Sequence, residues 1–218
     1  MKNIQIAIDG PASSGKSTVA KIIANHLAII YLDTGAMYRC ATLASLEIES
    51  KKSDEIINFL KENPIKFKKT SVFLGLNEVT EVIRENKVTE NVSEISALPK
   101  LREFLVEEQR RIATSTSIIM DGRDIGTIVL PEADLKIFLV ADVAERALRR
   151  HKENISRGIA SELSEIEKSI QARDIYDSTR EVAPLKAAED AITLDTTGKM
   201  IEEVVFIIEE MIKELTGK

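Results

Sequence analysis

The sequence has no tryptophan, a single cysteine (Cys40), nine glycines and five prolines among its 218 residues. One cysteine excludes an intrachain disulfide and a multi-cysteine zinc site, and it suits a reducing compartment, so we expect a cytoplasmic protein. The scarcity of glycine and proline, beside 44% hydrophobic residues, excludes collagen-like and disordered classes. We therefore expect a soluble globular protein in which residues 1–218 form one domain with an insertion.

The chain also lacks an excess of positive charge and any long apolar run. Its 30 Lys and Arg residues are outnumbered by 36 Asp and Glu residues, and the net charge of −6 argues against sequence-independent binding to nucleic acids. An aromatic content of 4% also disfavours a nucleic-acid-binding module. The apolar run Ile4–Ile8 ends at Asp9, so it is too short for a signal peptide or a membrane span. We expect neither a nucleic-acid partner nor a membrane partner.

Five apolar runs of strand length are separated by helix-like segments. The runs are continuous, which indicates strands buried on both faces of a parallel sheet in an α/β fold. The predicted strands are Ile4–Ile8, Ile29–Leu32, Ser117–Met120, Leu135–Val140 and Ala191–Leu194.

Three helices are predicted with specific starting signals. Residues 201–215 place their apolar side chains on one face, and Pro99 suits the first position of another helix. Ser164 and Glu167 have the spacing of a capping box, which predicts that a third helix begins at Ser164.

The segment from Asn63 to Ser93 has a different pattern. Its apolar residues stand among Lys, Thr, Glu and Asn at nearly two-residue spacing, at Ile65, Phe67, Val72, Leu74, Leu76, Val79, Val82 and Val88. This pattern predicts short antiparallel strands with one solvated face, in a small inserted subdomain.

The strongest functional signal is a glycine-rich loop between a predicted strand and a predicted helix. The loop has two glycines that flank four residues, followed by Lys-Ser, and it reads Gly10, Pro11, Ala12, Ser13, Ser14, Gly15, Lys16 and Ser17. The glycines let backbone N–H groups face phosphate oxygens, and the following helix adds its positive amino end. We expect Lys16 to reach the β and γ phosphates of a nucleoside triphosphate and the Ser17 hydroxyl to bind Mg²⁺.

A second motif follows the strand predicted at 117–120. Asp121, Gly122, Arg123 and Asp124 stand at its carboxyl end, the edge at which open α/β sheets bind ligands. We expect Asp121 to hold Mg²⁺ directly or through water. The alternative is a solvated turn without a function.

Arginine is concentrated in one part of the chain. Ten of the twelve arginines lie between Arg102 and Arg180, where only three of the eighteen lysines lie. Planar bidentate donors suit phosphate groups, so this bias favours phosphoryl recognition. The candidates are Arg123, Arg157, Arg173 and Arg180, whereas Arg110, Arg111, Arg149 and Arg150 are expected on helix faces, solvated or paired. His26, His151 and Cys40 show no catalytic spacing and are expected to be non-catalytic.

Four motifs together resemble those of the bacterial cytidylate kinases over nearly the whole chain. They are Asp9–Thr18, Leu32–Arg39, Asp121–Thr127 and the run Arg173–Arg180 with Ala183–Leu185. The resemblance implies a P-loop kinase with a five-stranded parallel sheet flanked by helices. It also implies an antiparallel monophosphate-binding subdomain at about 36–98 and a short lid at about 150–172. The implied reaction is transfer of the γ-phosphoryl group of ATP to CMP or dCMP with Mg²⁺, by a monomer, in pyrimidine nucleotide metabolism.

The resemblance assigns roles to individual residues. The transferred phosphoryl group would be stabilised by Lys16, Arg123, Arg180 and Arg157, with Arg157 in the lid, and ATP would be bound by Gly10 to Ser17 together with Thr18. The acceptor phosphate would be held by Arg39, Arg123 and Arg180, the ribose by Arg173 and Asp177, and the cytosine by Thr34, Ser93, Arg102 and Asp124. The N4 amino group of cytosine suits the Asp124 carboxylate, whereas uracil presents an oxygen that this carboxylate would repel.

Two alternatives remain open from the sequence. A GTPase-type switch would share the glycine-rich loop; Asn86–Thr89 resembles a guanine-reading motif without its aspartate, and Asp195–Gly198 has the spacing of a γ-phosphate sensor but comes too late in the chain. A kinase of another small acceptor would keep Lys16 and Asp121 but would need a different acceptor pocket.

Overall fold

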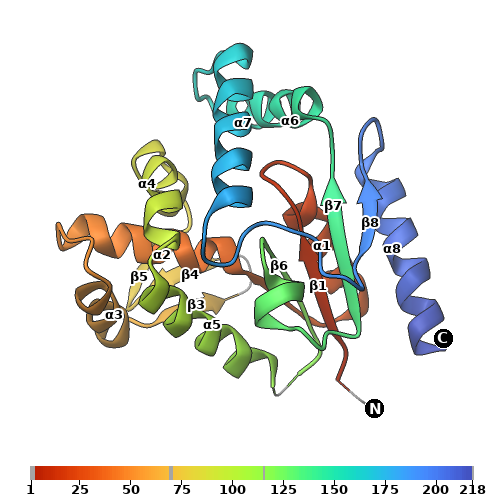
Figure 1. The fold of residues 1–218 in the computed structure, drawn as a ribbon, viewed down its shortest axis with the longest axis horizontal. Helices are drawn as coiled ribbons and strands as arrows, with labels where there is room; N and C mark the ends of the chain where they lie inside the picture. The colour runs from red at the N-terminus through yellow and green to blue at the C-terminus, as the bar shows by residue number, and fades with distance from the viewer. Residues whose placement is uncertain (1–2, 69–70, 115, 218) are drawn as a thin grey trace. The chain divides into compact units, whose positions relative to one another are not determined.

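The computed structural model describes residues 3–68, 71–114 and 116–217. The chain divides into two compact units, with Met1–Leu32 and Ala113–Lys218 in the first unit and Asp33–Ile112 in the second. Figure 1 shows the helices and strands of both units.

The first unit is built on the five-stranded sheet that the sequence predicts. The strand order is β2-β6-β1-β7-β8, and β1 pairs in parallel with both β6 and β7. The strands are β1 (Gln5–Asp9), β2 (Ile30–Asp33), β6 (Ile118–Gly122), β7 (Leu135–Val140) and β8 (Ile192–Asp195). All five predicted strands are confirmed; Leu135–Val140 has the predicted bounds, and the ends of the other four shift by one or two residues. Strand β1 lies between two strands from the second half of the chain, β6 and β7, so residues far apart in sequence meet at the carboxyl edge of the sheet.

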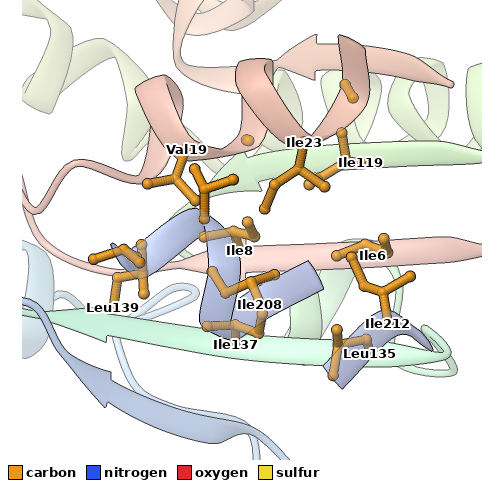
Figure 2. Close-up of a cluster of buried hydrophobic side chains, with 14 residues drawn as sticks. Ile6, Ile8, Val19, Ile23, Ile119, Leu135, Ile137, Leu139, Ile208 and Ile212 are labelled. Carbon is orange, nitrogen blue, oxygen red and sulfur yellow. The ribbon is translucent and has the colours of Figure 1, made fainter. Parts of the chain in front are cut away.

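Helices α1 and α8 cover one face of this sheet. Figure 2 shows side chains of α1 (Lys16–Leu27) and α8 (Ile201–Thr216) packed against β1, β6 and β7. The buried cluster includes Ile6, Ile8, Val19, Ile23, Ile119, Leu135, Ile137, Leu139, Ile208 and Ile212. Because side chains alternate along a strand, the opposite face of β1 and β7 carries Ala7, Asp9 and Lys136. The remaining elements of this unit are a π-helical turn (Ile125–Val129), α6 (Val143–Ser156) and α7 (Leu163–Thr179).

The second unit combines four helices with the predicted antiparallel sheet, among the residues that the structure describes. The elements are α2 (Thr34–Glu47), α3 (Ser53–Glu62), β3 (Ile65–Lys68), β4 (Ser71–Leu74), β5 (Asn77–Glu78), a short 3₁₀ turn (Val82–Arg84), α4 (Asn86–Ser96) and α5 (Pro99–Ala113). The sheet order is β3-β4-β5, with antiparallel pairing throughout.

The antiparallel prediction is confirmed for the strands at 65–68, 71–74 and 77–78 and is wrong for residues 82–93, which form a 3₁₀ turn and part of α4. Val88, Val92 and Ile95 are buried on one face of α4, at helical and not strand spacing. The β-branched residues of this segment favour strands, but burial of that helical stripe overrides the preference.

The other helix starts have mixed outcomes. Helices α5 and α8 begin as expected, at Pro99 and Ile201. The capping box at Ser164 is wrong: α7 begins at Leu163, its N-cap is Glu162 in extended geometry, and Ser164 lies inside the first turn. In the described part of the chain, no helix has both the length and the apolar character needed to span a membrane.

Candidate active site

The glycine-rich loop connects the end of β1 to the start of α1. A Cβ atom at Gly10 would lie 2.2 Å from the carbonyl oxygen of Leu139, so β7 approaches too closely for any residue with a side chain. Gly15 has φ 91° and ψ −5°, a left-handed conformation suited to glycine, directly before the first helical residue. No side chain caps the amino end of α1, and its first turn holds no acidic residue. This end of the helix can therefore accept an anion.

Lys16 lies beneath this loop. Its side chain is buried, and its Nζ donates a hydrogen bond to the carbonyl oxygen of Pro11 at 2.9 Å. Burial, followed by the positive charge of Arg123, lowers the pKa of Lys16, while Asp121 opposes the shift. This buried ammonium group donates to a neutral carbonyl oxygen, and a phosphate group at the loop would place negative charge beside it.

Ser17 and Tyr31 both donate to the carboxylate of Asp121. The Ser17 hydroxyl donates to Oδ2 at 2.6 Å, and the Tyr31 hydroxyl donates to Oδ1 at 2.8 Å. Hydroxyl and carboxylate oxygens are ligands that Mg²⁺ prefers, and Mg²⁺ commonly keeps several waters and substrate phosphates besides one or two protein ligands. The described residues contain no cluster of three or more His, Cys, Asp and Glu side chains that could hold a metal by themselves. The donor set therefore fits a magnesium ion shared with a nucleotide.

Arg123, Arg173 and Asp177 form a charged group in the first unit. Arg123 Nε donates to Asp177 Oδ2 at 3.1 Å, and Arg173 Nε lies 3.7 Å from the same oxygen. Asp177 is almost fully buried. Arg180 follows the end of α7, and its Nε donates to the carbonyl oxygen of Ala183 at 2.7 Å. Two arginines, Arg123 and Arg173, thus lie beside one buried carboxylate, and Arg180 is held by the backbone three residues after it.

Arg157 is placed differently from the other arginine candidates. It is the C-cap residue of α6, directly before Gly158, whose φ is 70°. Its side chain is exposed. The structure thus leaves this arginine at the end of a helix, at a left-handed glycine.

Two arginines near the loop were not selected from the sequence. Arg146 has a side chain that is only 4% exposed, and it donates to the carbonyl of Ala12 at 3.3 Å and to Asp174 Oδ2 at 2.6 Å. Arg149 donates to the carbonyl of Thr196 at 2.6 Å and to that of Ser14 at 3.5 Å. Arg149 Nε also donates to Glu145 Oε1 at 3.1 Å, one turn earlier on α6, so the expected pairing on a helix face is confirmed. Its contacts with the carbonyls of Ser14 and Thr196 are additional and were not expected from the sequence.

The other arginines outside the site are arranged largely as expected. Arg111 pairs with Glu108 and Arg150 pairs with Glu153, both on exposed helix surfaces, and the Arg110 side chain is exposed. His26 lies 2.6 Å from Glu209 on the surface, and His151 lies 3.1 Å from Ser161.

The second unit carries its own candidates, beginning at the end of β2. Asp33 caps α2 by accepting from the Ala36 amide at 2.8 Å, and Arg39 Nη2 donates to Asp33 Oδ2 at 3.0 Å. Gly35 allows this pair to form, because a Cβ there would lie 3.1 Å from Asp33 Oδ1 and 3.2 Å from Arg39 Nη1. Thr34, the residue between Asp33 and Gly35, is buried.

Arg102 is held rigidly within the second unit. Its Nη1 donates to the carbonyl oxygen of Ser96 at 2.9 Å, and its guanidinium lies over the Tyr38 ring at 5.1 Å from the centroid. It is almost fully buried, whereas Ser93, one turn before Ser96 on α4, is partly exposed. Stacking on an aromatic ring fixes the plane of a guanidinium and so orients its donors.

The parallel sheet, the glycine-rich loop, the buried Lys16 and the Ser17–Asp121 pair together define the class of P-loop kinases. The family model for cytidylate kinase matches residues 6–214, and the chain belongs to this family. The resemblance in the sequence is thereby confirmed, and the GTPase alternative loses its support. Asn86–Thr89, the segment that suggested it, forms the first turn of α4.

Curated relatives match almost the whole length of the chain. A cytidylate kinase from Lactococcus lactis subsp. lactis is 62% identical over 99% of this chain and 100% of its own. A cytidylate kinase from Streptococcus agalactiae is 59% identical over 99% of this chain and 98% of its own. Among solved structures, an uncharacterized protein from Eubacterium ventriosum matches at a TM-score of 0.54 with 14% identity and complete coverage of both chains, which shows a shared fold.

Proposed function

We propose that this protein transfers the γ-phosphoryl group of ATP to CMP or dCMP, giving ADP and CDP or dCDP. The observation that carries the proposal is the family match over residues 6–214 in a chain whose loop brings Lys16, Ser17 and Asp121 together. It acts on small nucleotides, as a monomer in the cytoplasm, within pyrimidine nucleotide metabolism.

ATP binds at the glycine-rich loop in this proposal. Its phosphates lie against the loop backbone and the uncapped amino end of α1, held by residues Gly10, Pro11, Ala12, Ser13, Ser14, Gly15, Lys16, Ser17 and Thr18. The buried charge of Lys16 stabilises the negative charge that develops on the transferred group. Ser17 and Asp121 hold Mg²⁺, directly or through water; when bound, this ion neutralises phosphate charge.

Acceptor binding is assigned to individual residues in this proposal. Arg39, Arg123 and Arg180 hold the acceptor phosphate, and Arg173 and Asp177 approach the ribose. Asp124 accepts from the N4 amino group of cytosine, and the other residues around the base are Thr34, Ser93 and Arg102. The burial of Asp124 and Arg102 supports a role in base selection, because a buried polar group left unpaired by the wrong base costs binding energy.

Two segments close over the bound nucleotides. Residues 36–98 act as the monophosphate-binding subdomain, and residues 150–172 act as a lid whose Arg157 reaches the donor phosphates. The exposed Arg157 beside Gly158 supports this role, because a left-handed glycine at a helix end suits a segment that changes direction. Closure excludes water, which would otherwise accept the phosphoryl group.

The transfer proceeds without a covalent enzyme intermediate. Phosphoryl transfer depends mainly on alignment of donor and acceptor and on stabilisation of spreading negative charge. Lys16, Arg123, Arg157 and Arg180 supply positive charge for that purpose.

A coupled assay of ADP release tests the proposal. Purified protein is assayed with Mg-ATP and each of five acceptors, CMP, dCMP, UMP, AMP and GMP, and the rates of ADP release are compared with that of a control lacking any acceptor. We expect CMP and dCMP to be far better acceptors than the others. ADP release that is the same with every monophosphate would overturn the acceptor assignment, and a better rate with another monophosphate would favour the alternative of a different acceptor.

A further inference from the structure

Asp9 is a buried carboxylate that the roles proposed above do not use. It is the last residue of β1, the central strand, and only 5% of its surface is exposed. Its side chain points to the face of the sheet opposite the apolar cluster formed with α1 and α8. A buried carboxylate is costly unless hydrogen bonds satisfy it, so its partners indicate what it does.

Those partners are two backbone amides of the segment that follows β6. Ile125 N donates to Asp9 Oδ1 at 2.8 Å, and Gly126 N donates to Asp9 Oδ2 at 2.7 Å. They are the first two amides of the π-helical turn Ile125–Val129, where a helical segment has N–H groups without partners inside the turn. Each oxygen of Asp9 thus fixes one amide.

The segment is also confined from its other side. A Cβ at Gly126 would lie 3.4 Å from Asp9 Oδ2 and 3.2 Å from Lys136 Cδ. Lys136 is itself held, because its Nζ donates to the carboxylate of Asp190 at 2.8 Å and 2.9 Å and also to the carbonyl of Pro131. Gly126 is therefore seated between Asp9 and the stem of Lys136.

These bonds place Arg123 and Asp124 between two fixed points. Gly122 ends β6 and pairs in register with Asp9, while Ile125 is tied to the side chain of Asp9. Only Arg123 and Asp124 lie between them. The carbonyl of Asp124 also accepts from Ile128 N at 2.9 Å, so its backbone belongs to the anchored turn.

We propose that Asp9 is a positioning residue for acceptor selection: by binding the amides of Ile125 and Gly126, it fixes the orientation of Asp124 and so sets the preference for cytosine over uracil. The inference rests on the proposed function, in which Asp124 reads the base. It gives a residue that precedes the phosphate-binding loop a part in acceptor recognition.

The test compares Asp9→Asn with wild type. An amide can accept one of the two N–H bonds with its oxygen, but its NH₂ group would face the other N–H donor, so the turn must shift. We expect the ratio of kcat/KM for CMP to that for UMP to fall by roughly tenfold or more, since small misplacements of a binding group have large effects. The KM for ATP should change by less than about threefold, because the backbone of Asp9 stays in β1.

Two further variants separate positioning from stability. Lys136→Met removes the hydrogen bonds of Lys136 to Asp190 and to the Pro131 carbonyl but keeps a side-chain stem against the same turn, and it should lower thermal stability without changing the CMP:UMP ratio. Gly126→Ala leaves the Asp9 carboxylate intact and displaces the turn from it, so it should also lower the CMP:UMP ratio. This variant tests the inference independently if the Asp9→Asn protein does not fold.

Asp124→Asn completes a double-mutant cycle. If Asp9 acts through Asp124, adding Asp9→Asn to Asp124→Asn should not lower the CMP:UMP ratio further. A ratio lowered by Asp124→Asn but unchanged by Asp9→Asn and Gly126→Ala would overturn this inference alone, leaving Asp9 as a stabilising residue. A wild-type ratio in Asp124→Asn would overturn the assignment of the base-reading residue and the inference with it.

Discussion

The hydroxyl of Ser17 donates a 2.6 Å hydrogen bond to the carboxylate of Asp121, across a sequence separation of 104 residues. Ser17 is the second residue of α1, and Asp121 stands near the end of β6, which lies next to β1 in the sheet. The parallel order of the strands brings the two together at the carboxyl edge, where ligands bind in open α/β sheets. This contact joins the two motifs that the sequence presents separately.

Replacing Ser17 by Ala should raise the Mg²⁺ concentration needed for half-maximal activity by roughly tenfold or more, because it removes an oxygen ligand and leaves Asp121 without that donor. Ser17→Thr keeps the hydroxyl and should stay near wild type. The measurement is kcat as a function of free Mg²⁺ at saturating ATP and CMP. An unchanged Mg²⁺ dependence in a folded Ser17→Ala protein would remove Ser17 from the metal site.

Lys16→Ala should reduce turnover by at least ~100-fold, because it removes preorganised positive charge at the transferred phosphoryl group. Its fold should persist, since the residue lies at the first turn of a helix that is anchored by Val19, Ala20 and Ile23. Steady-state assays and far-UV circular dichroism check the two halves of this expectation. Near-normal turnover in a folded variant would contradict the role of Lys16.

Much of this site could be predicted from sequence because its parts are local. The loop and the Asp121–Asp124 motif are each short runs bounded by a continuous apolar strand, and burial on both faces of a sheet makes such strands readable. The helix α4 could not be read in this way, because Val88 and Val92 have strand-favouring side chains and only the packed unit shows that they share a helical face.

Arg146 shows a second limit of prediction from the sequence. On a helix rich in charge, it looks the same as Arg150, which forms an exposed pair with Glu153. Its burial depends on the Ala12 carbonyl, which is distant in sequence, and on Asp174 of the neighbouring helix. The hydrogen bonds of Asp9 and Tyr31 could not be predicted for the same reason, since their partners lie on other strands and turns.

Arg146→Met should raise the KM for ATP and destabilise the protein by about 1–3 kcal/mol, because it leaves the Ala12 carbonyl and Asp174 without their donor while keeping side-chain volume. Arg150→Met is the matched control: it removes an exposed ion pair from the same helix and should change stability by less than about 1 kcal/mol. Urea denaturation and ATP titration distinguish the two. Equal effects of both substitutions would show that Arg146 has no special link to the loop.

Cys40 should be unreactive in the folded protein. It is fully buried in α2, and burial raises the pKa of its thiol to about 12. An acid whose pKa is higher in the folded state than in the unfolded state stabilises the fold at lower pH, and that contribution is lost as the pH rises from about 9 toward about 12. The free energy of unfolding should therefore fall less steeply above pH ~9 in Cys40→Ala than in wild type.

A thiol reagent at pH ~8 should modify Cys40 in the native protein only as fast as the protein opens. Rapid labelling without unfolding, or identical pH slopes in the two proteins, would contradict the burial of this thiol.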